Sequence, residues 1–183
     1  MSRIIPLRLL AVTLAFVLLV SCSSQNDDKL SHTFESAFAV TLTVNNAQTE
    51  YCARITVSAI TLSDSGEPLT VRDGSVQYIS PDSISDIYAR RTDSTVVVGL
   101  GGIEITPSPD IAAKYVRLLD MLDIRSESFR SAGKVRIDGV ELVEAVFTCG
   151  AGDVTVLFDA ETQLPISATC NEIQIRFSEF TYL

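Results

Sequence analysis

The chain has 183 residues, the length of one domain with at most a short appendage. Apolar residues make up 46% of it and charged residues 20%, which is a globular composition. Asp and Glu total 23 against 14 Lys and Arg, so the net charge is −9, and there is one His. This acidity excludes general nucleic-acid binding, and a single His excludes metal centres that need two.

The first residues have the pattern of a secretory signal. Arg3 and Arg8 precede an apolar run at residues 9–20, which is long enough for a signal peptide and too short to span a bilayer. The segment that ends in Ser21 and Cys22 resembles the bacterial lipobox. That resemblance implies cleavage between these two residues and a diacylglycerol thioether, with a further fatty acid such as palmitate, on Cys22. The alternative is an uncleaved signal anchor in which Cys22 is incidental.

Cleavage would divide the chain into three parts: a lipoprotein signal peptide at 1–21, a lipid-anchored flexible tether at 22–33 and a β domain at 34–183. It would remove two arginines and no acidic residue, so the net charge would fall from −9 to −11. An acidic domain is repelled by anionic headgroups, and residues 23–31 are polar and without periodicity. We therefore expect a monomer that stands off the extracytoplasmic face of a bacterial cell membrane on its tether.

Alternation of apolar and polar residues dominates the rest of the chain and predicts β-strands. Asp138-Gly139 is the strongest hairpin signal. We expect about ten antiparallel strands. Eleven candidate segments lie near residues 38–44, 51–59, 69–71, 76–79, 87–91, 95–100, 135–137, 140–149, 153–158, 164–170 and 173–180.

One segment breaks the alternation and predicts a helix. Ser108 suits an N-cap, Pro109 the first helical position and Asp110 the first turn. Apolar residues then recur at helical spacing as far as Leu122, over an arc too broad for a helix that rests on open solvent. The predicted fold class is mainly β (α+β): a curled, unclosed antiparallel sheet, or half-barrel, around one central helix.

The C-terminal strands carry a resemblance to a known family. A strand from Val154, the turn Asp159-x-x-Thr162-x-x-Pro165 and the ending Ile175–Phe180 are similar to the LolA/LolB family. The mycobacterial glycolipid-handling lipoproteins look alike in fold. The glycine-rich strand Val96–Ile103 before a helix that starts with Pro resembles small uncharacterised clostridial lipoproteins. The resemblance implies an unclosed β-barrel with a helical lid and transport of lipoproteins or lipid through the envelope.

An unclosed sheet with a helix against it predicts an apolar groove, which is the usual form of a ligand site. We expect a lipid or other apolar ligand there, with six candidate lining residues: Phe38, Val40, Leu42, Tyr115, Leu119 and Phe147. The alternative for each residue is that it simply fills the core. The alternative function is a ligand-free structural or interaction module of the cell envelope or spore.

The residues offer little for catalysis, so we expect no enzyme, cofactor or metal. Ser131-x-x-Lys134 fits the acylating motif of penicillin-recognising enzymes, but the other elements of that family are missing from the sequence. His32 falls in the predicted tether. Asp110, Asp120 and Asp123 have no calcium-loop spacing and are expected on solvated faces.

Three cysteines remain besides Cys22. Cys149 and Cys170 share faces with apolar residues and are expected to point into the core, whereas Cys52 falls on a polar face. The sequence does not determine their pairing, and we favour three free thiols over a disulfide.

Overall fold

A computed structural model describes residues 27–61 and 71–183 of the protein. The predicted signal peptide, Cys22 and most of the strand expected at 69–71 lie outside the described residues. Among the helices of the described ranges, none has the length and apolar character needed to cross a bilayer.

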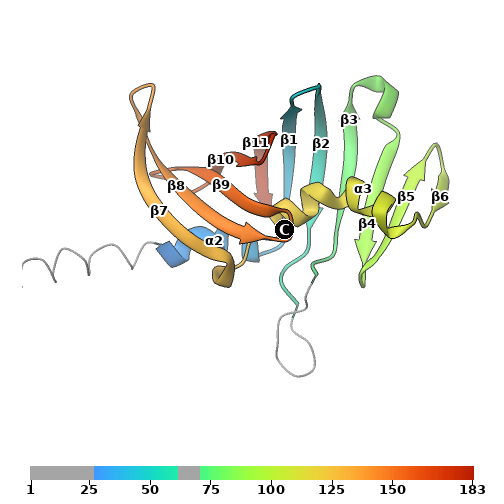
Figure 1. The fold of residues 1–183 in the computed structure, drawn as a ribbon, viewed down its shortest axis with the longest axis horizontal. Helices are drawn as coiled ribbons and strands as arrows, with labels where there is room; N and C mark the ends of the chain where they lie inside the picture. The colour runs from blue at the N-terminus through green and yellow to red at the C-terminus, as the bar shows by residue number, and fades with distance from the viewer. Residues whose placement is uncertain (1–26, 62–70) are drawn as a thin grey trace, which may run out of the picture.

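The described chain forms one 11-stranded antiparallel sheet, where about ten strands were expected. The sheet does not close (Figure 1). Its order is β6-β5-β4-β3-β2-β1-β11-β10-β9-β8-β7. The strands are β1 (Phe38–Asn46), β2 (Thr49–Val57), β3 (Gly74–Ser80), β4 (Ile87–Thr92), β5 (Thr95–Leu100), β6 (Ile103–Ile105), β7 (Phe129–Ile137), β8 (Val140–Cys149), β9 (Gly152–Asp159), β10 (Pro165–Cys170) and β11 (Ile173–Tyr182).

The sheet is two meanders that meet in its middle. The first runs outward from β1 to the edge strand β6, and the second runs inward from the edge strand β7 to β11, which pairs with β1. The helix α3 (Pro109–Leu122) connects the two edges, so it has to cross the sheet (Figure 1). This connection explains why the predicted helix is embedded, and the predicted half-barrel around a helix is confirmed.

Local signals explain most element boundaries. Ser108 is the extended N-cap of α3 and Pro109 begins the helix, as predicted. Asp138 and Gly139 both have positive φ, 50° and 84°, and join β7 to β8 as the predicted two-residue hairpin. β7 begins six residues before the expected 135, so Gly133 lies within a strand rather than in a turn.

Side chains on one face of the sheet form the core, and α3 packs against them. Leu119 is buried on the side of α3 that faces β3. A Cβ at Gly74 would stand 2.6 Å from the carbonyl oxygen of Thr56 and 3.0 Å from Cδ2 of Leu119. Only glycine at the start of β3 therefore leaves room for the helix to approach this closely.

The predicted flexible tether at 22–33 is wrong from residue 27 onward. Residues Asp27–Glu35 form the helix α2, and Leu30 and Phe34 are 3% and 0% exposed. The Phe34 ring lies 5.8 Å from the Phe38 ring and 6.1 Å from the Phe158 ring, measured between centroids. Two apolar residues four positions apart make one apolar stripe on a short helix, which the surrounding polar residues hide in the sequence.

If α2 is part of the core, Phe34→Ala should lower the free energy of unfolding by about 3–5 kcal/mol, the usual cost of removing a buried aromatic ring. Urea unfolding of the chain from Ser23 onward, which contains every described helix and strand, measures this. Tyr182→Ala is the matched control, because Tyr182 is 50% exposed. If Phe34→Ala lowered the free energy of unfolding no more than Tyr182→Ala does, α2 would not be part of the core.

Candidate functional site

The six residues predicted to line a groove lie together, but inside the core. Five of them are no more than 1% exposed, and Tyr115 is half-buried at its edge. The five are Phe38, Val40, Leu42, Leu119 and Phe147. In this structure they fill the space between sheet and helix, which is the alternative that the sequence left open.

An open cleft does lie between α3 and the sheet, at the N-terminal end of α3. We call it the α3–β5 cleft; its volume is about 430 Å³. Its walls are the start of β5, the connection from β6 to α3 and one side of the first three turns of α3. The lining residues are Ser94, Thr95, Val96, Thr106, Pro107, Pro109, Ala112, Ala113, Val116 and Asp120.

Helical spacing and short side chains form this cleft. Pro109, Ala113, Val116 and Asp120 are separated by four, three and four residues, so they share one side of α3. The short side chains of Ala112 and Ala113 leave space beside the helix. The backbone N–H of Ile111 and that of Ala112 both donate to the carbonyl oxygen of Ser108, which fixes the start of the helix. The cleft is therefore formed by rigid elements.

Among the described residues that line the cleft, Asp120 alone is ionisable. Arg91 donates from Nη1 to its Oδ1 at 2.5 Å, and the Arg91 side chain is 5% exposed against 34% for that of Asp120. Nε of Arg91 donates to the carbonyl oxygen of Arg72 at 2.7 Å. The Asp120 carboxylate is therefore accessible from the cleft, whereas its counter-ion Arg91 is buried.

The acidic residues of α3 were expected on solvated faces, which is correct for exposed Asp110 only. Asp120 pairs with Arg91, and Asp123 pairs with Arg125, Oδ1 to Nε, at 3.0 Å. The Arg91–Asp120 pair depends on how α3 lies across the fold, whereas the Asp123–Arg125 pair is local, between residues two positions apart. Arg125, two residues after Asp123, was a local signal for the second pair, whereas nothing in the local sequence around Asp120 could have indicated the first.

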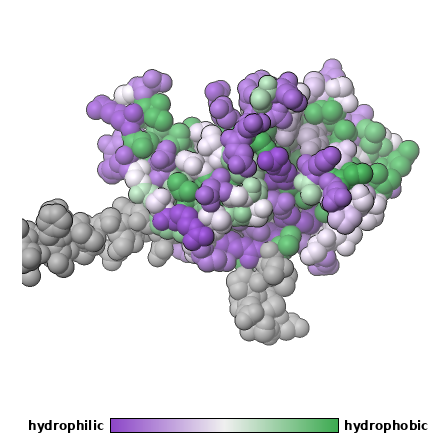
Figure 2. Space-filling view, viewed as in Figure 1, coloured by the Kyte–Doolittle hydropathy of each residue, from purple (hydrophilic) through white to green (hydrophobic). Residues whose placement is uncertain are grey.

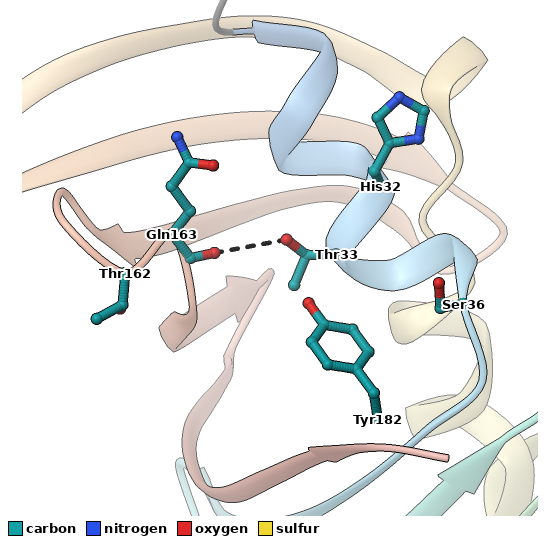
Figure 3. A pocket seen from close by; sticks show the side chains of 6 residues that line it. All are labelled: His32, Thr33, Ser36, Thr162, Gln163 and Tyr182. Carbon is teal, nitrogen blue, oxygen red and sulfur yellow. Dashed lines mark hydrogen bonds between the residues drawn. The ribbon is translucent and has the colours of Figure 1, made fainter.

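A second pocket, of about 460 Å³, lies between α2 and the β9–β10 turn (Figure 3). Hydroxyl and amide side chains and Tyr182 line it, and the Thr33 hydroxyl donates to the carbonyl oxygen of Gln163 at 3.4 Å. His32, on its rim, points away from these residues in Figure 3. Its Nδ1 lies 2.6 Å from Oε2 of Glu35. None of the described lining residues is aliphatic, and the large apolar surface of this pocket comes from the Tyr182 ring.

Glu35 connects His32 with Ser126. The Ser126 hydroxyl and backbone N–H both donate to the Glu35 carboxylate. Desolvation raises the pKa of Glu35, but the hydrogen bonds from Ser126 and His32 outweigh it and hold that pKa below its usual value of 4.5. Because Glu35 stands between the serine and the imidazole, His32 does not contact the hydroxyl that it would have to activate as a base.

The other candidates for chemistry stay apart. Ser131 and Lys134 lie on the strand β7, not at a helix start, and Nζ of Lys134 pairs with Oε1 of Glu141 at 2.7 Å. Cys52, Cys149 and Cys170 are free thiols, with Cys170 in the core as expected. Within the described ranges, no three His, Cys, Asp or Glu side chains come together as a metal site would need.

Cys149 is only half-buried, packed against the core. Its thiol lies 3.5 Å from the carbonyl oxygen of Gly152, and burial raises its pKa. A thiol of this kind is a weak nucleophile at neutral pH.

No protein-family model matches the chain, and no curated protein matches it either. Among solved structures, an uncharacterised conserved protein from Thermus thermophilus aligns with a TM-score of 0.50 and 12% identity, over 85% of this chain and 84% of its own. A LolA superfamily protein from Nitrosomonas europaea aligns with a TM-score of 0.42 and 9% identity, over 86% and 93%. LprF from Mycobacterium bovis aligns with a TM-score of 0.40 and 15% identity, also over 86% and 93%.

At these identities the likeness concerns the fold alone. The unclosed antiparallel sheet with a helix across one face is the architecture that the resemblance to LolA/LolB implied, and that expectation is confirmed. The alignments assign no ligand to the α3–β5 cleft.

Removal of the Arg91 guanidinium should destabilise the fold, because it leaves the Arg72 carbonyl and the Asp120 carboxylate without their donor. We expect Arg91→Met to lower the free energy of unfolding by about 1–3 kcal/mol in a urea titration. Arg90→Met is the control, because the side chain of Arg90 is 55% exposed. An Arg91 variant as stable as the Arg90 variant would contradict a structural role for the pair.

Proposed function

We propose that this protein is a membrane-anchored extracytoplasmic lipoprotein that binds an apolar or lipid ligand in the α3–β5 cleft. The observation that carries the proposal is the cleft itself: Val96, Pro107, Pro109, Ala113 and Val116 give it apolar walls. Its volume of about 430 Å³ lies within the roughly 300–1,000 Å³ of small-molecule sites. A binding role also suits the arrangement of His32, which pairs with Glu35 and does not contact the Ser126 hydroxyl.

Exposed apolar side chains extend this surface beyond the cleft. Leu100, Ile103 and Ile105 are 56%, 71% and 57% exposed, and Figure 2 shows hydrophobic residues gathered over this end of the sheet. Ile105 is the register partner of buried Val98, so it lies on the core face of the sheet, the face that α3 covers. An apolar patch of this kind beside an apolar cleft supports an apolar ligand or partner at this end of the molecule.

The sequence resemblance supports the same proposal. The strands from Val154 to Phe180 are similar to those of LolA/LolB proteins, which carry lipoproteins or lipid. The ligand site differs from the one first expected, because the large apolar residues between sheet and helix pack against one another. A ligand would instead occupy the end of α3 where alanines face the sheet edge.

The membrane anchor is the lipid proposed on Cys22. Only five residue steps separate Cys22 from Asp27, the first residue of α2. Five steps span at most about 18 Å when fully extended. Since α2 is packed into the core, the domain would be held close to the membrane with α2 toward it, rather than on a long leash.

Filling the cleft should weaken ligand binding. We expect the chain from Ser23 onward to bind the neutral probe N-phenyl-1-naphthylamine saturably, and Ala113→Phe to weaken that binding at least about tenfold because the ring occupies the cleft. Probe fluorescence measures the affinity, and circular dichroism checks the fold. Lys114→Phe, at the exposed neighbouring position on α3, is the control. Absence of saturable binding by the unsubstituted chain would refute the proposed function.

Lipidation should depend on Cys22 alone. In a bacterial host fed an alkyne-bearing palmitate analogue, we expect the unsubstituted protein and Cys52→Ala to incorporate label, and Cys22→Ala to incorporate none. Mass spectrometry of the labelled N-terminal peptide locates the site. Label retained by Cys22→Ala would mean that a different residue is acylated, and an unsubstituted protein without label would mean an uncleaved signal anchor.

A further inference from the structure

We infer that the α3–β5 cleft selects positively charged amphiphiles: an apolar chain that ends in an ammonium group, with Asp120 as the residue that binds the ammonium. This inference rests on the proposed function and gives its ligand a charge. The apolar walls would take the chain, and the single carboxylate in the lining would take the head.

Asp120 has acceptor capacity left for a ligand. A carboxylate offers about four lone-pair positions, and Arg91 takes one at Oδ1. The Asp120 side chain is 34% exposed and belongs to the lining of the cleft. An ammonium group that enters the cleft can therefore donate to Asp120 while the pair with Arg91 stays intact.

None of the described lining residues offers a positive group to an anion. Arg91 is 5% exposed, and its Nε and Nη1 are engaged by the Arg72 carbonyl and Asp120. Turning its guanidinium toward an anionic ligand would break both bonds inside the core. Arg117, on the same helix, lines a different pocket, beside Asn171 and Ile173.

The surroundings of the cleft favour the same sign of charge. Asp93 precedes the lining residue Ser94, and Asp110 follows the lining residue Pro109; both aspartates are exposed. Lys114 is the nearby exposed cation on α3, and it is not among the lining residues. The whole chain has a net charge of −9, so its long-range field attracts cations and repels anions.

Three ligands with the same chain length separate charge from apolar contact. Dodecylamine, dodecanol and dodecanoate are each titrated, below their aggregation concentrations, against N-phenyl-1-naphthylamine bound to the chain from Ser23 onward. We expect dodecylamine to bind at least about tenfold more tightly than dodecanoate, with dodecanol between them, and high salt to narrow the difference.

Asp120→Asn removes the charge with little change of shape. It should reduce the preference for dodecylamine over dodecanoate by about tenfold and leave the affinity for dodecanol unchanged. Asp110→Asn is the matched control, because it removes a charge from the same helix outside the cleft. The comparison of the three ligands on the unsubstituted protein does not depend on the stability of either variant.

The outcomes separate this inference from the function on which it rests. Equal or tighter binding of dodecanoate, or an amine preference that survives Asp120→Asn in a folded variant, overturns the charge selection and leaves an apolar binding protein. If neither the probe nor any of the three ligands binds, the proposed function fails and the inference fails with it.

Discussion

The arrangement of this protein depends on one buried guanidinium. Arg72 lies just before β3, is 3% exposed and donates to the carbonyl oxygens of Phe34, Ser36 and Ser58. Desolvation lowers its pKa to about 10, so it is still charged at neutral pH. A charge can be buried at acceptable cost only where its donors are satisfied. Because two of these acceptors belong to the end of α2 and the residue after it, α2 can dock in one place only, and docking it completes the environment of Arg72.

The same interaction continues to the candidate site. The Arg72 carbonyl accepts Nε of Arg91, and Arg91 holds Asp120 on α3. Three segments distant in the sequence, α2, β4 and α3, are thereby joined through two arginines that lie beside the apolar core. The helix nearest the proposed lipid anchor and the helix that forms the cleft thus belong to one packed unit. A ligand in the cleft would contact a helix whose position is already fixed.

The sequence predicts what local chemistry decides. Ser108 and Pro109 start α3 and Asp138-Gly139 turns β7 into β8, because a cap and a turn need only a few neighbouring residues. Leu30 and Phe34 were missed because two apolar residues in a polar stretch become meaningful only when the sheet offers them a surface. The six residues predicted to line a groove lie in or against the core, because the sequence does not show how closely side chains from distant strands and from α3 pack against one another. Ala113 and Asp120 fall on one side of the predicted helix, but the spacing alone could not show that this side borders a cleft, because that depends on where β5 lies.

The position of the cleft follows from how α3 is packed along its length. Its last turns bury Leu118, Leu119, Met121 and Leu122 against the sheet, and Arg91 fixes Asp120 beside them. Its first turns bury little, with Ile111 48% exposed, because β6 is only three residues long and the sheet ends there. One end of the helix therefore provides stability, and the other end leaves apolar surface unused. In the proposed function an apolar chain would bind at the second end without displacing the core at the first, so a filled interior does not conflict with a ligand site between helix and sheet.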